Sequence, residues 1–179
     1  RKAELLRSHG ISSEKSEFEP KSNEEIWNYQ QIMLGFNYRM SDIHAALGLS
    51  QFNKVDEFVE KRHKIAQSYN ISLKDFPFTT QKQPDDCYSS FHLYLIKLNP
   101  DVKDYQQKIW KSLRQDKILV NLHYIPVYRQ PYYASLGFKE GHCPNAEDYF
   151  KRILSIPIYP HLTSEDQERV IFSLEKAIK

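Results

Sequence analysis

The feature that most constrains the fold is a helical periodicity that starts at residue 43 and continues to about residue 70. Its apolar residues recur at spacings of three, four or multiples of these: Ile43, Leu47, Val55, Phe58, Ile65 and Tyr69. This spacing places the side chains on one face of an α-helix. Ser41 is a good N-cap for that helix, and Asp42 adds negative charge to its first turn. We therefore expect one long helix over 41–70, of the kind that more often connects two substructures than lies inside one.

The residues before this helix predict shorter elements. RKAELLRSHG (1–10) is typical of the back half of a helix, and Gly10 can cap it. Residues 12–25 are polar and contain a proline, so we expect an exposed loop there. From Ile26 to Leu34 the chain favours a half-buried strand, with aromatic residues such as Trp27.

The residues after the long helix alternate between strand and helix patterns. Branched and aromatic residues predict three extended segments: 91–98, 118–124 and 156–160. The prolines of the last segment confine it to a sheet edge. The sequence predicts three helices: one after Pro100, one over about 145–153, and one after Thr163, which is a good N-cap. Because neighbouring strands need not be parallel, the predicted class is α+β, with a small, largely antiparallel sheet covered by helices on one side.

Composition excludes several classes of function. The 179 residues fit one domain, or one domain with a detached piece of a neighbour. The net charge is +2, with 25 basic and 23 acidic residues interspersed, so we expect no nucleic-acid partner. No apolar run approaches the roughly 18 residues of a membrane span, and no signal peptide is recognisable. Cys87 and Cys143 fit neither a metal spacing nor a disulfide framework, and we expect buried or idle thiols in a reducing compartment, the cytoplasm.

Candidate catalytic groups are not gathered by a familiar motif. His44 and His63 fall on the expected long helix but share no turn. The sequence holds no HExxH, no Cys/His cluster and no GxSxG, and its five glycines leave little room for a phosphate-binding loop. We therefore expect no metal site and no catalytic residue within this chain. If the protein is catalytic, the reacting groups lie elsewhere.

Two stretches could nevertheless bind a ligand. GFNYRMSDIHAALGLSQ (35–51) places Asn37 and Arg39 two positions apart before a helix start. It is either a simple loop before a capped helix or a phosphate-facing loop that the helix holds in place. HYIPVYRQPYY (123–133) gathers aromatic residues, an imidazole and Arg129. Such a loop is typical of a surface that stacks and hydrogen-bonds a sugar or nucleotide, and the alternative is a tyrosine-rich packing loop.

These two stretches and SIPIYPHLTSEDQERVI (155–171) resemble, in that order and at that spacing, a known enzyme family. They are similar to the carboxy-terminal portion of the DegT/DnrJ/EryC1/StrS sugar aminotransferases, which use pyridoxal 5'-phosphate. The resemblance covers essentially the whole chain. The HY-x-P-V-x-x-Q-PYY form is most similar to the branch that aminates UDP-4-keto-6-deoxy-N-acetyl-altrosamine in pseudaminic acid biosynthesis.

The resemblance implies a type I aminotransferase fold of large and small domains. Residues 1–40 would be the end of the large cofactor domain and a connecting loop, 41–70 a linker helix, and 71–179 the small carboxy-terminal domain. In the family the lysine that binds the cofactor lies just upstream of the stretch that matches RSHGI (7–11). Lys2 is not expected to replace that lysine, because it falls after the expected position. We therefore expect a fragment that is inactive by itself.

The resemblance also implies roles for four residues. Asn37 matches an asparagine that reaches across a homodimer to the phosphate of the partner's cofactor. Arg39 would meet the phosphates of the nucleotide, or else pair with Asp42. His123 and Tyr124 match positions near the sugar nucleotide.

One departure from the family is visible before the predicted strand at 118–124. Asp116 and Lys117 stand where many members carry a glycine, so the geometry of the turn there is an open question.

In the intact enzyme, glutamate would donate the amino group and the C4 ketone of a UDP-4-keto-6-deoxy-N-acetylhexosamine would accept it. Two alternatives stay open at this point. One is a sugar dehydratase on the same fold, with a histidine in place of the lysine. The other is a domain without catalytic activity that serves dimerisation or ligand binding.

Overall fold

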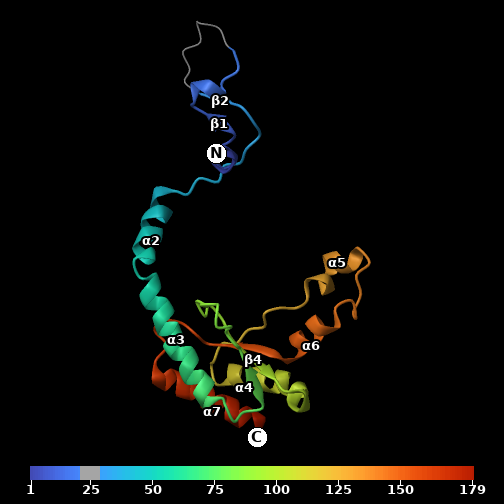
Figure 1. Ribbon diagram of the computed structural model, residues 1–179. Coiled ribbons are helices and arrows are strands. Elements are labelled where there is room, and N and C mark those ends of the chain that lie inside the picture. The colour runs from blue at the N-terminus through green and yellow to red at the C-terminus, as the bar shows by residue number, and fades with distance from the viewer. Residues whose placement is uncertain (21–28) are drawn as a thin grey trace. The chain divides into compact units, whose positions relative to one another are not determined.

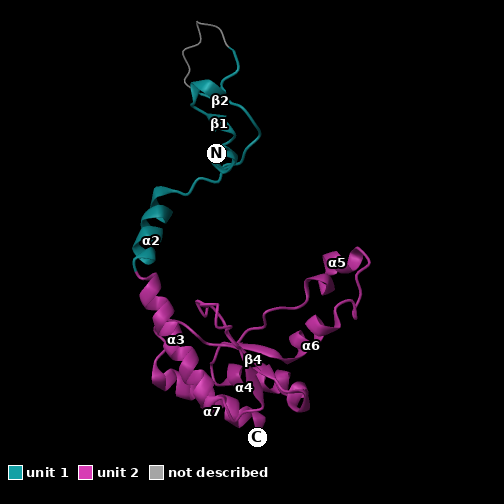
Figure 2. Cartoon of the chain, in the orientation of Figure 1, with its two compact units in different colours: residues 1–53 teal, residues 54–179 magenta. Residues whose placement is uncertain are grey.

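The computed structural model describes residues 1–20 and 29–179, and Figure 1 shows the order of its helices and strands. The chain divides into two compact units, residues 1–53 and residues 54–179 (Figure 2). Trp27 and the last part of the loop predicted over 12–25 lie outside the described residues.

Unit 1 opens with helix α1 (Lys2–Arg7), as the sequence predicts. Gly10 has a φ of 70° and its N–H donates to the carbonyl of Leu5 at 2.7 Å, so it closes this helix. After this turn, β1 (Ile11–Ser12) pairs antiparallel with β2 (Gln30–Gln31), and the short 3₁₀ helix η1 (Lys15–Glu17) lies in the loop between them. The predicted strand over 26–34 is therefore two residues long within the described part of the chain.

The long helix predicted over 41–70 is two helices, α2 (Asp42–Phe52) in unit 1 and α3 (Val55–Ser72), which begins unit 2. The prediction of one continuous helix is wrong at Lys54, where φ is −110° and ψ is 0°. These angles lie in the bridge region rather than in the helical well, so the helix ends there. The periodicity did not reveal the break because the apolar residues of both helices keep the same spacing across it.

The core of unit 2 is built on a three-stranded antiparallel sheet in the order β3-β4-β5. Its strands are β3 (Phe78–Thr80), β4 (Tyr94–Leu98) and β5 (Ile153–Ile156). The strand predicted over 91–98 is confirmed at β4. The strand predicted over 156–160 is wrong except for Ile156, because the edge strand β5 comes before it and ends where Pro157 has no N–H to donate to a ladder.

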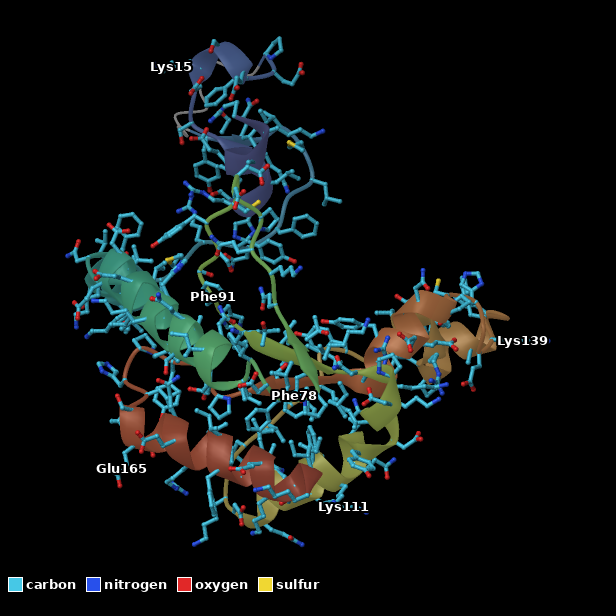
Figure 3. All side chains as sticks on the ribbon, turned by 60° about the horizontal axis from the view of Figure 1, so that its bottom comes forward. Lys15, Phe78, Phe91, Lys111, Lys139 and Glu165 are labelled. Carbon is cyan, nitrogen blue, oxygen red and sulfur yellow. The ribbon has the colours of Figure 1, made fainter. Side chains whose placement is uncertain are left out.

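Helices cover one face of this sheet. The side chains of alternate β4 residues, Tyr94, Ile96 and Leu98, enter a core shared with α3, α4 (Gln106–Gln115) and α7 (Ser164–Ile178). Figure 3 shows side chains filling the space between the sheet and helices α4 and α7. Leu95 and Lys97 point to the opposite face and are only half-buried. The α+β prediction is confirmed, with an antiparallel sheet.

The remaining elements of unit 2 complete the helical layer and the loop beyond it. They are η2 (Pro100–Tyr105), η3 (Val127–Arg129), α5 (Pro131–Ser135) and α6 (Pro144–Arg152). α6 confirms the helix predicted near 145–153. Thr163 caps α7 as predicted, because its hydroxyl accepts the N–H of Asp166 at 3.1 Å.

Among the described residues, the segment predicted as a strand over 118–124 forms one bridge with β5, between Asn121 and Ser155. The prediction of a regular strand is therefore wrong. Lys117, just before this segment, has a φ of 62°, the left-handed conformation that costs a residue with a Cβ about 1–2 kcal/mol. The turn thus keeps a backbone that suits glycine although a lysine occupies the position.

Candidate functional site

The segment that carries Asn37 is fixed to the end of α1 by backbone hydrogen bonds. The N–H of Phe36 donates to the carbonyl of Leu6 at 2.6 Å, and the N–H of Tyr38 donates to that of Arg7 at 2.9 Å. These carbonyls belong to the last turn of α1, where no helical donor remains for them. An isolated bridge also joins Asn37 to Ser8. The C-terminal end of α1 therefore sets the backbone position of the Asn37 segment.

Two glycines allow this close approach. A Cβ at Gly35 would overlap the backbone nitrogen of Gly10, and a Cβ at Gly10 would overlap the carbonyl of Met33. Any other residue at either position would push the two chain segments apart.

Asn37 and Arg39 extend from the same side of this segment. The rings of Phe36 and Tyr38 stack at 5.0 Å, and in an extended chain residues 37 and 39 point to the side away from them. Asn37 is exposed, and its amide makes no hydrogen bond within the described part of the chain. Arg39 donates from Nε to the hydroxyl of Ser8 at 3.1 Å. An ion pair between Arg39 and Asp42, one of the two predicted possibilities, is not formed among the described residues.

The predicted cap of the following helix is confirmed. Ser41 Oγ accepts the N–H of His44 at 3.4 Å and lies 2.8 Å from Nδ1 of the same residue. The helix is therefore capped, and the loop before it presents two exposed polar side chains, while the phosphate-facing interpretation stays a prediction.

His123 and Tyr124 lie together in unit 2, just after the bridge between Asn121 and Ser155. Nδ1 of His123 lies 2.6 Å from Oγ of Ser155. The Tyr124 ring lies edge-on to the imidazole, with centroids 4.6 Å apart, and 69% of the residue is exposed. The peptide bond between the two residues is cis. Asn37 and Arg39 belong to unit 1, whereas His123 and Tyr124 belong to unit 2.

A buried carboxylate anchors the aromatic loop that follows. The Tyr128 hydroxyl donates to Oε1 of Glu147 at 2.6 Å, and the N–H of Gly141 donates to the same oxygen at 2.7 Å. The N–H of Cys143 donates in turn to the Tyr128 hydroxyl at 3.2 Å. The Tyr128 hydrogen bond and then the Gly141 hydrogen bond hold the pKa of Glu147 below its usual range. Tyr128 is thus a packing residue of the loop.

The rest of this loop lies away from the sheet, as Figure 1 shows for α5. Tyr124 and Tyr132 are exposed, so they are available to a ligand.

Sequence reasoning missed both Glu147 and Ser155. Glu147 gives no signal in the sequence, but a serine inside the apolar run ILSIP is a signal that could have pointed to Ser155.

A pocket of about 450 Å³ lies elsewhere in unit 2, between residues 117–119 and 157–170. Neither His123 nor Tyr124 lines this pocket, so it is not the site that the sequence predicts.

Other kinds of site find no support among the described residues. No group of three or more His, Cys, Asp or Glu side chains there could hold a metal ion. None of the helices in the described ranges is long and apolar enough to cross a membrane. Cys87 and Cys143 are both free and exposed, which excludes the buried alternative of the two that the sequence left open.

The model of the DegT/DnrJ/EryC1/StrS aminotransferase family matches residues 1–175, which is nearly the whole chain. The chain belongs to this family. A UDP-4-amino-4,6-dideoxy-N-acetyl-beta-L-altrosamine transaminase of Campylobacter jejuni is 35% identical over 182 residues, covering 99% of this chain and 46% of the relative. The family member described here thus spans less than half the length of the curated relatives it matches.

Solved structures agree with the fold. Helicobacter pylori PseC, an aminotransferase involved in the biosynthesis of pseudoaminic acid, is 31% identical with a TM-score of 0.83. The match covers 98% of this chain and 45% of PseC. The putative sugar aminotransferase Spr1654 of Streptococcus pneumoniae, in its PMP form, has a TM-score of 0.86 at 22% identity over 97% of this chain and 43% of its own, which supports the fold alone. The predicted carboxy-terminal portion of an aminotransferase fold is confirmed.

The Glu147 anchor predicts an acid-sensitive stability. Because the pKa of Glu147 is lowered in the folded state, its stabilising contribution is present above the ordinary value of 4.5 and is lost as the pH falls through the lower folded value. Glu147→Gln should therefore lower the melting temperature at pH 7, and its melting temperature should fall less than that of the wild type between about pH 7 and about pH 2.5.

Glu140→Gln is the matched control on the same loop. Glu140 is exposed and pairs with Arg129 and Lys151 at 3.7 Å, so its loss should leave the acid sensitivity unchanged. Equal declines in melting temperature for wild type and Glu147→Gln would show that this carboxylate does not anchor the loop.

Proposed function

We propose that the whole protein is a nucleotide-sugar aminotransferase that depends on pyridoxal 5'-phosphate. It moves an amino group from glutamate to the C4 ketone of a UDP-4-keto-6-deoxy-N-acetylhexosamine, a step of pseudaminic acid biosynthesis. The observation that carries the proposal is the match of 99% of this chain to the Campylobacter jejuni transaminase at 35% identity. The likeness to PseC at 31% identity supports the same branch of the family.

The residues of unit 1 fit the phosphate of the cofactor. The Asn37 amide is exposed and free of hydrogen bonds within the described chain, and its backbone is held by α1. An amide N–H₂ can donate to a phosphate oxygen without adding charge. Pyridoxal phosphate, when bound, supplies the electron sink for amino-group transfer. Asn37 is the residue of this chain that we assign to hold its phosphate.

Arg39 is suited to the diphosphate of a nucleotide. Its Nε is occupied by Ser8, which fixes the guanidinium, and its Nη groups have no partner among the described residues. A planar guanidinium can bind two phosphate oxygens at once. We assign Arg39 to the nucleotide phosphates on this ground.

His123 and Tyr124 are assigned to the sugar nucleotide. The exposed Tyr124 ring offers an apolar face and a hydroxyl, a combination suited to a sugar or a base. His123 offers the ring nitrogen that Ser155 does not contact. The two side chains extend from one short segment, so they would meet neighbouring parts of the same ligand.

We further propose a cytoplasmic homodimer in which Asn37 serves the cofactor of the partner subunit. The apolar side chains of Ile43, Leu49 and Phe52 on α2 are all exposed here, and side chains of this kind are usually buried in an assembled protein. In the same scheme residues 1–40 belong to the large domain, 41–70 link the domains, and 71–179 form the small domain.

Asn37→Ala in the whole protein should weaken retention of the cofactor by about 1–3 kcal/mol, the cost of leaving a charged oxygen short of one donor. Asn37→Asp should weaken it further, because a carboxylate beside a phosphate adds repulsion. Dialysis followed by quantification of bound cofactor measures both effects.

Mixing tests whether Asn37 acts across subunits. Heterodimers of Asn37→Ala with a variant that lacks the cofactor lysine should regain one good site per dimer. If mixing restores no activity, Asn37 acts within its own subunit or not at all.

Truncation of Tyr124 or His123 to alanine should raise the KM for the keto-sugar nucleotide about tenfold, a loss of about 1.4 kcal/mol. The glutamate half-reaction, which never involves the nucleotide, should keep its rate. Single-turnover cofactor spectra separate the two half-reactions. Tyr128→Phe is the control for a packing role and should lower the melting temperature without this selective rise in KM. Equal damage to both half-reactions with a lower melting temperature would favour the packing interpretation of 123–133.

A further inference from the structure

Ser155 is a buried hydroxyl on an otherwise apolar strand. The four residues of β5 are Ile153, Leu154, Ser155 and Ile156, and all are buried. The register places Ser155 opposite Leu95, on the sheet face that α4 and α7 do not cover. A hydroxyl in such a place is unfavourable unless it has a hydrogen-bond partner. Its one side-chain partner within the described residues is His123.

The backbone brings these two residues together. The N–H of Asn121 donates to the carbonyl of Ser155 at 3.2 Å, and the N–H of Ser155 donates to the carbonyl of Asn121 at 2.9 Å. His123 follows two residues later, so its side chain leaves the chain on the same side as that of Asn121. The imidazole reaches Ser155 Oγ with Nδ1 at 2.6 Å, which is a short hydrogen bond.

The direction of this hydrogen bond follows from the number of protons that the serine hydroxyl and the imidazole can donate. A serine hydroxyl has one proton, and a neutral imidazole has one N–H and one bare nitrogen. If Nδ1 carried the proton, Ser155 would accept it, and its own hydroxyl proton would be buried without an acceptor. If Nδ1 is bare, Ser155 donates to it and every buried proton is paired. The second arrangement is favoured because an unpaired buried donor is costly.

We propose that Ser155 is a positioning residue that holds His123 in the tautomer with its proton on Nε2. Nε2 makes no hydrogen bond within the described part of the chain, so this N–H is free for a ligand. In this tautomer His123 donates a hydrogen bond and does not accept a proton through Nε2. The identity of the acceptor rests on the proposed function: the Nε2–H of His123 donates to an oxygen of the bound nucleotide sugar.

The tautomer can be read without substrate. In whole protein labelled with ¹⁵N-histidine, spectra at about pH 8.5, well above the ordinary imidazole pKa of about 6.5, should show His123 with an unprotonated Nδ1 and a protonated Nε2. A His123→Gln variant assigns the signals. Ser155→Ala should give a mixture of tautomers, and Ser155→Thr, which keeps the hydroxyl, should restore the single form.

Ser173→Ala is the matched control, because Ser173 is also buried but donates to Asp116 instead. It should leave the His123 signals unchanged. A protonated Nδ1 in the wild type, or a Ser155→Ala spectrum like that of the wild type, would overturn the proposal whatever the protein catalyses.

Kinetics test the consequence for the ligand. Ser155→Ala should raise the KM for the keto-sugar nucleotide about three- to tenfold, the scale of one neutral hydrogen bond, and Ser155→Thr should recover most of the loss. The glutamate half-reaction should not change. An unchanged KM beside a changed tautomer would overturn the positioning role. The predicted tautomer in a protein that never accepts a nucleotide sugar would leave the Ser155 assignment standing and refute the proposed function.

Discussion

The site in unit 2 depends on how β5 is paired. On one side β5 forms a continuous ladder with β4, and on the other the described residues form one bridge to the incoming chain, at Asn121. Pro157 has no N–H to donate, so it offers no hydrogen bond to the chain that comes in before Asn121. The single bridge is enough to bring His123 over Ser155, and the loop beyond it can lie away from the core without disturbing the ladder.

The two candidate sites are held in different ways. In unit 1 the backbone of α1 fixes the Asn37 segment, the Asn37 amide makes no hydrogen bond within the described residues, and Ser8 holds Arg39 at Nε. In unit 2 a side-chain hydrogen bond fixes His123, and a buried carboxylate fixes the loop after it. The proposed function assigns the first arrangement to the phosphate of the cofactor and the second to the sugar nucleotide.

Local signals in the sequence were sufficient for the parts of the fold that local chemistry decides. Ser41 and Thr163 cap the helices expected of them, and the alternation around β4 marks a strand with one buried face. The break at Lys54 was not predictable because the apolar spacing continues across it. The single bridge at Asn121 and the anchor at Glu147 depend on residues distant in the chain, and no local pattern encodes such contacts.

The central claim is that the whole protein transfers nitrogen to a sugar. The most direct measurement incubates it with pyridoxal phosphate, ¹⁵N-glutamate and a UDP-4-keto-6-deoxy-N-acetylhexosamine, and follows the sugar nucleotide by mass spectrometry. The account predicts a product in which an amino group carrying ¹⁵N replaces the ketone oxygen. A product that has lost water without gaining nitrogen would instead point to a dehydratase, and recovery of the unchanged keto-sugar would contradict catalysis of this reaction.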